Sequence, residues 1–137
     1  MIRLTRAYHF SASHRLHLAT LSESENFELF GKCNNLYGHG HNYRLEITVE
    51  GPVDAGTGLV VDQPALDALV RTRVLASYEH RYLNEDVPEF RDLNPTTENM
   101  VASVRLRLEE AWPAGFPKLV HVRIQETKRN VIELAIQ

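Results

Sequence analysis

The chain has 137 residues, 43% of them hydrophobic and 24% charged, with a formal net charge of −3. These values are typical of one ordinary globular domain, which we expect to span residues 1–137, and the negative charge argues against nucleic acid as the main partner. Apolar residues never run for more than three in succession, whereas a membrane span needs about 20, and Arg3 and Arg6 interrupt the N-terminus where a secretory signal would be apolar.

Cys33 is the only cysteine, so no disulfide can form within the chain. A protein that does not rely on disulfides is suited to a reducing compartment, and we expect a cytoplasmic location.

Alternating hydrophobicity predicts a strand near the N-terminus. From Tyr8 to Leu16, residues at even positions are mostly apolar and residues at odd positions are polar. This period of two predicts a strand with one buried face. His14 lies on the apolar face, and His9 lies on the opposite one.

The clearest alternation in the chain runs from His39 to Glu50. Both His39 and His41 lie on the face that carries the apolar residues, so this segment predicts a second half-buried strand. Residues 18–35 form the connection between the two strands. Connections longer than about 12 residues are usually functional or disordered.

Two helices are expected in the middle of the chain. Asp62 is a good N-cap, and the Asn94–Glu98 segment marks the second helix start. Apolar residues at helical spacing follow each start. They are Leu66, Leu69, Val70 and Val74 in the first helix, and Val101, Val104, Leu108 and Ala111 in the second.

Strands at 119–126 and 131–136 are separated by a short polar link, which predicts a hairpin. The order ββααββ predicts an α+β fold, in which a four-stranded antiparallel sheet carries two helices on one face. Two edge strands remain with unpaired backbone groups, and these favour pairing with another subunit in a homo-oligomer.

His39 and His41 predict a metal site. Their side chains lie on one face of a strand, about 6.5–7 Å apart. If the first two strands pair, His14 reaches the same point. Three imidazoles with one open position are typical of catalytic zinc. The alternative is that these histidines are buried and bonded to neighbours. His17 competes as third ligand, but continued strand would turn it away.

Three further groups carry possible chemistry. Cys33 could be a fourth ligand, a base or a buried filler. Glu79 could fix the tautomer of His80, although the pair could also be solvated surface. Glu126 continues an apolar strand face, and it either reaches solvent or holds the guanidine-like edge of a ligand through two parallel hydrogen bonds. We interpret His9, His17 and His121 as surface or packing residues.

A set of short segments spread over nearly the whole chain is highly specific when taken together. These segments are Phe10-Ser11-Ala12-Ser13-His14-Arg15-Leu16, Gly31-Lys32-Cys33-Asn34-Asn35, Gly38-His39-Gly40-His41-Asn42-Tyr43, Glu79-His80, Leu83-Asn84, Asn94-Pro95-Thr96-Thr97-Glu98-Asn99 and Glu126-Thr127. With them the chain resembles the 6-pyruvoyl-tetrahydropterin synthases, pterin enzymes of the tunnelling fold.

The resemblance implies a zinc-dependent lyase that acts on 7,8-dihydroneopterin triphosphate and assembles as trimers paired into hexamers, with sites at subunit boundaries of a barrel. It implies roles for particular residues. They are zinc ligation by His14, His39 and His41, base catalysis by Cys33, a relay by His80 with Glu79, and pterin binding by Glu126 with Thr96, Thr97 and Glu98 nearby.

One departure from the family pattern is Glu79, where the family has Asp. The six-residue step from Cys33 to His39 resembles the pyruvoyl-forming enzymes more than the related 6-carboxy-tetrahydropterin synthases of queuosine biosynthesis, and both products stay open. A protein that binds zinc or pterin without catalysis is a more distant alternative. A structural zinc would need a fourth protein ligand, for which Cys33 is the obvious donor.

Overall fold

The fold is built on one four-stranded antiparallel sheet. The computed structural model describes all residues from Met1 to Gln137. The strands are β1 (Ile2–His14), β2 (His39–Gly51), β3 (Lys118–Gln125) and β4 (Val131–Ala135). They lie in the order β1-β2-β3-β4, and each neighbouring pair is antiparallel. The predicted sheet is therefore confirmed, with β1 and β4 at its two edges.

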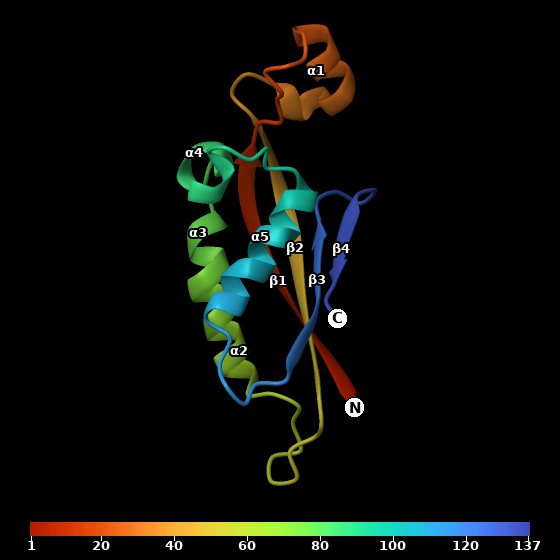
Figure 1. Cartoon of the computed structure of the whole chain (residues 1–137), viewed down its shortest axis with the longest axis vertical. Helices are drawn as coiled ribbons and strands as arrows, with labels where there is room; N and C mark the ends of the chain where they lie inside the picture. Colours follow the sequence, from red (N-terminus) through yellow and green to blue (C-terminus); the bar gives the residue numbers. More distant parts are fainter.

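Helices cover one face of this sheet (Figure 1). The helical segments are α1 (Glu23–Phe30), η1 (Gly31–Asn34), α2 (Gln63–Val70), η2 (Arg71–Leu75), α3 (Ala76–Tyr78), α4 (Leu83–Asp86), η3 (Pro88–Phe90) and α5 (Thr97–Glu110). α2, η2 and α3 follow one another without a break, and η2 is a wider π-helical turn. The continuous helix formed by α2, η2 and α3 is the first of the two helices that the sequence predicts, and α5 is the second.

Two predictions differ most clearly from the structure. β1 begins at Ile2 rather than Tyr8, because Ile2 pairs with Gly51 at the far end of β2. The 18–35 connection is also more regular than expected, since it contains α1 and η1. Ser22 caps α1 by accepting a hydrogen bond from the backbone of Glu25, and the Glu25 side chain accepts one from the backbone of Ser22. This reciprocal pair is a capping box, which starts a helix from local sequence alone.

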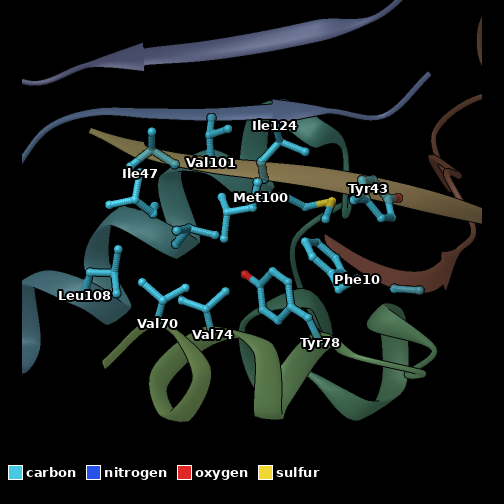
Figure 2. Packing of buried hydrophobic residues seen from close by; sticks show 14 of the residues in the cluster. Phe10, Tyr43, Ile47, Val70, Val74, Tyr78, Met100, Val101, Leu108 and Ile124 are labelled. Atoms are coloured by element: carbon cyan, nitrogen blue, oxygen red, sulfur yellow. The ribbon is translucent and has the colours of Figure 1, made fainter. Parts of the chain in front are cut away.

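The core fills the space between the sheet and the helices. Leu45 and Ile47 of β2 and Ile124 of β3 are fully buried against Val74 and Val104 from the two helices. Figure 2 shows side chains from the sheet and from both helices meeting in this layer. None of the helices is both long enough and apolar enough to cross a membrane.

The candidate site lies at the end of the sheet where β1 stops and β2 starts. There the chain leaves the sheet to form α1 and η1, which project beyond the strands (Figure 1). Thr96 caps the first turn of α5, because its side chain accepts a hydrogen bond from the backbone of Asn99. The cap fixes where α5 begins, and it presents Thr97 toward the end of β3.

Candidate active site

Strand register brings three imidazole rings together. His14 lies directly opposite His39 in the β1–β2 ladder, and His41 lies opposite Ala12. The ring centroids of His14 and His41 are 5.0 Å apart, and those of His39 and His41 are 4.8 Å apart. The prediction that β1 and β2 pair and so gather these three side chains is therefore confirmed.

Cys33 joins the histidines from η1. One ligand atom each from His14, Cys33 and His41 lie within 4.8 Å of one another, close enough to share a metal ion. Cys33 Sγ is 3.5 Å from His41 Nε2. The backbone N–H of Leu16 donates to the Cys33 carbonyl at 2.7 Å, which fixes η1 against the chain that leaves β1.

Hydrogen bonding selects the tautomer of His14. Its ring is fully buried, and Nδ1 lies 2.8 Å from the carbonyl oxygen of Pro95, which can only accept. Nδ1 therefore carries the hydrogen and Nε2 keeps a lone pair, which is the arrangement of a metal-ligating histidine. Burial lowers the pKa of His14, so the ring is held in the neutral form that binds metals.

Two buried ring nitrogens have no hydrogen-bond partner, and they are His14 Nε2 and His39 Nδ1. Buried polar atoms are costly to leave unpaired, so such a pair indicates a ligand that the protein chain does not supply. Imidazole nitrogens beside a thiol suit a zinc-like divalent ion. The donor set therefore fits a metal; the three ligand atoms that lie within 4.8 Å of one another come from His14, Cys33 and His41, and the His39 ring centroid is 4.8 Å from that of His41.

Glu126 is held inside the site rather than in solvent. Its side chain is only 12% exposed, one oxygen accepts a hydrogen bond from Thr97 Oγ1, and the other lies 3.8 Å from His41 Nε2. Burial is the main cause that raises the pKa of Cys33, and the Glu126 charge raises it further. Burial lowers the pKa of His41, and Glu126 opposes that effect.

One cavity of about 340 Å³ adjoins these groups. Its polar lining includes the predicted base and all four predicted substrate-binding residues. They are Cys33, Thr96, Thr97, Glu98 and Glu126. Leu29 and Phe30 from α1 and Ile132 from β4 supply apolar walls. A pocket that combines apolar walls with a few convergent polar groups is suited to a small molecule.

Comparison with known proteins agrees with this arrangement. A family model described as 6-pyruvoyl tetrahydropterin synthase matches residues 3–136. The chain belongs to this family. Proteins named 6-pyruvoyl tetrahydrobiopterin synthase from Poecilia reticulata and Homo sapiens are 43% and 40% identical to it. These alignments cover 94% and 95% of this chain, and 86% and 88% of the relatives.

The fold agrees with the same family. The solved structure of Caenorhabditis elegans 6-pyruvoyl tetrahydropterin synthase is 36% identical and has a TM-score of 0.88. The match covers 99% of this chain and 96% of that one. The family fold that the sequence segments imply is thus confirmed by the arrangement of the whole chain.

Glu79 and His80 do not line the cavity that contains Cys33, but His80 lines another cavity, of about 680 Å³, together with His41. Glu79 and His80 lie along the outer edge of β1, where the backbone N–H of Ser11 donates to Glu79 Oε2 and the N–H of His80 donates to the Ser11 carbonyl. Glu79 Oε1 is 3.1 Å from His80 Nε2, so the longer carboxylate still reaches the ring. His80 has a φ of 57°, a strained conformation for a non-glycine residue that is common at functional sites.

The remaining histidines are placed as surface or packing residues. His9 is exposed, and His17 Nδ1 pairs with the side-chain amide of Asn34 at 3.0 Å. His121 lies 3.7 Å from Glu133 of β4. None of the three belongs to the group of ligand atoms around Cys33.

Tyr43 is a site neighbour that the alternation pattern treats as core. Its ring is 1% exposed and meets the rings of His41 and His14 edge-on, with centroids 5.5 and 6.4 Å away. Burial, and then the charges of Glu126 and Cys33, raise the pKa of Tyr43, so its hydroxyl stays protonated. Hydrophobic periodicity could not reveal this residue, but its place two positions after His41 could have.

Proposed function

We propose that the protein is a zinc-dependent lyase that converts 7,8-dihydroneopterin triphosphate to 6-pyruvoyl-tetrahydropterin and releases triphosphate. The observation that carries the proposal is the convergence of His14, Cys33 and His41 beside a cavity that contains the Glu126 carboxylate. The names and the extent of the similar proteins support this product over the 6-carboxy alternative.

His14, His39 and His41 would hold the zinc ion. The two unpartnered nitrogens of His14 and His39 support this assignment, and it leaves Cys33 free for chemistry. Zinc in an open site supplies Lewis-acid stabilisation of negative charge on ligand oxygens. Pro95 contributes through its carbonyl, which keeps the lone pair of His14 on Nε2.

Cys33 is the proposed general base. As a thiolate, its Sγ would accept a carbon-bound proton from the substrate side chain. Burial and Glu126 both favour the neutral thiol, so a nearby positive charge is needed to form the thiolate. Cys33 Sγ lies 3.5 Å from His41 Nε2. Because His41 would hold the zinc ion, the positive charge of the zinc would lie near the thiol.

Glu126 is the proposed anchor of the pterin ring. A carboxylate can accept two parallel hydrogen bonds from the guanidine-like edge of a pterin. Thr97 holds one carboxylate oxygen, and the low exposure of the group strengthens hydrogen bonds to it. Thr96 and Glu98 line the same cavity, and we propose that they form part of the wall of the pterin-binding site.

We propose that two copies of the chain complete each site within a trimer or hexamer. Glu79 and His80 lie along the outer edge of β1, whereas the cavity with Cys33 opens beside Ile132 of β4, the other edge strand. Pairing β1 of one copy with β4 of the next would bring His80 to the neighbour's cavity. It would also satisfy the outer backbone groups of β4 and those of β1 that residues 79–82 do not already bond. With one cysteine and no disulfide, we place this assembly in the cytoplasm.

Product analysis tests the reaction. Purified protein loaded with zinc is incubated with 7,8-dihydroneopterin triphosphate, and the products are identified by mass spectrometry. We expect 6-pyruvoyl-tetrahydropterin and free triphosphate. A 6-carboxy product would establish the alternative enzyme, and binding of substrate without release of triphosphate would show a non-catalytic pterin protein.

Complementation tests the shared site. Cys33→Ala and His80→Ala chains are unfolded together, mixed and refolded, and the activity of the mixture is compared with that of each variant alone. A site built from two copies regains activity in mixed oligomers, because some sites then combine an intact Cys33 with an intact His80. If both residues act within one chain, mixing restores nothing.

A further inference from the structure

The Tyr43 hydroxyl is a buried donor with no hydrogen-bond partner. A polar group in this position is normally paired, because leaving it unpaired is unfavourable. The ring cannot turn away to find solvent, since it stacks on Phe10 with centroids 4.9 Å apart and planes 15° from parallel. Figure 2 shows the two rings together at one end of the buried cluster.

Strand register places this hydroxyl-bearing residue next to the proposed pterin anchor. Tyr43 lies opposite Phe10 of β1, and the β2–β3 ladder pairs Arg44 with Gln125. Continuing that antiparallel register by one position sets Tyr43 opposite Glu126, with both side chains on the core face. Tyr43 therefore lies between Phe10 and Glu126 across the three neighbouring strands.

One oxygen of the Glu126 carboxylate has no hydrogen-bond donor within the chain. The other oxygen accepts a hydrogen bond from the Thr97 hydroxyl, whereas this one lies 3.8 Å from His41 Nε2, which is too long for a hydrogen bond. The Glu126 oxygen and the buried Tyr43 hydroxyl are therefore an acceptor and a donor at neighbouring strand positions, and neither has a partner.

We propose that Tyr43 is a positioning residue whose hydroxyl donates a hydrogen bond to Glu126 when ligand occupies the site. Thr97 and Tyr43 then hold the two carboxylate oxygens from the protein side, one bond to each. A carboxylate has about four acceptor positions, so one on each oxygen remains for the pterin edge. This inference rests on the proposed function, because it assigns Glu126 to pterin binding.

Tyr43→Phe tests the inference, because it removes the hydroxyl and keeps the ring that stacks on Phe10. The probe is unsubstituted pterin, a fluorescent ring that has the guanidine-like edge and no side chain to react. In the zinc-loaded protein, we expect the pterin dissociation constant to rise about tenfold, the usual effect of one hydrogen bond to a charged group. Zinc content should equal that of the wild type.

Tyr78→Phe is the matched control. Tyr78 is also fully buried and packs against Phe10, but its hydroxyl is already bonded to Ser103. We expect this variant to unfold at a temperature several degrees lower, with pterin affinity unchanged. A purely structural role for the Tyr43 hydroxyl would give Tyr43→Phe the same pattern, and that result would overturn the inference.

A double-mutant cycle with Glu126→Gln shows whether Tyr43 acts through the carboxylate. We expect the tenfold effect of Tyr43→Phe to shrink to less than about twofold in the Glu126→Gln background. The full effect in that background, or wild-type affinity in Tyr43→Phe alone, would overturn the inference and leave the proposed function standing. Absence of pterin binding by the wild type would overturn both.

Discussion

Glu89 offers a quantitative test of the hydrogen bonds that connect the two helices covering the sheet. Its carboxylate accepts hydrogen bonds from Arg107 Nε and Nη2 of α5, at 2.6 and 2.8 Å. It also accepts one from Ser103 Oγ at 2.6 Å, and Ser103 is bonded in turn to Tyr78 of α3. Glu89 thus connects η3 to both helices.

The size of the effect follows from the pKa of Glu89. The hydrogen bonds from Arg107 are the main cause that lowers it from 4.5 to about 2, and burial opposes them. A change of this size corresponds to about 3 kcal/mol at ~1.4 kcal/mol for each tenfold change in proton binding. Because 32% of the side chain is exposed, solvent screening reduces the expected stabilisation to roughly 1–2 kcal/mol.

The stabilisation should depend on pH in a defined direction. The pKa of Glu89 is lower in the folded state, so the stabilisation is fully present above the ordinary value of 4.5 and is lost as pH falls toward 2. We therefore expect Glu89→Gln to lower the free energy of unfolding by roughly 1–2 kcal/mol at pH 7. At pH 3 the difference from wild type should be half of that or less.

Urea unfolding at pH 7 and pH 3, at one fixed protomer concentration, measures both values. Glu85→Gln is the control, because Glu85 is a nearby exposed carboxylate whose side chain makes no hydrogen bond or ion pair. A Glu89→Gln difference that is equal at the two pH values, or no larger than that of Glu85→Gln, would refute the reasoning.

Three changes in the site have distinct expected outcomes. Cys33→Ala should keep zinc and pterin binding but lower kcat by at least about 100-fold, the usual range for loss of a general base, and a smaller loss would exclude that role. His39→Ala should lose zinc on elemental analysis, and full occupancy would contradict its assignment as a ligand. Glu126→Gln should weaken pterin binding in a fluorescence titration, because a neutral amide offers a single acceptor oxygen, and unchanged affinity would remove Glu126 from the pterin site.

Local patterns in the sequence are sufficient to predict the strands, the two main helices and part of the site. A period of two places His39 and His41 on one face wherever that strand lies, because alternate residues of any strand point the same way. The start of α5 follows equally from the capping residue Thr96. α1 was also readable from Ser22 and Glu25, although the length of the connection hid it.

Only the tertiary structure decided which of these side chains meet. The β1–β2 register sets His14 against His39, and the end of η1 brings Cys33 to His41, across distances that periodicity does not encode. The burial of Glu126 depends on Thr97, which approaches from a different element. Hydrogen bonding and burial depend on partners far away in the chain, so they become defined only when the sheet and the helices have packed together.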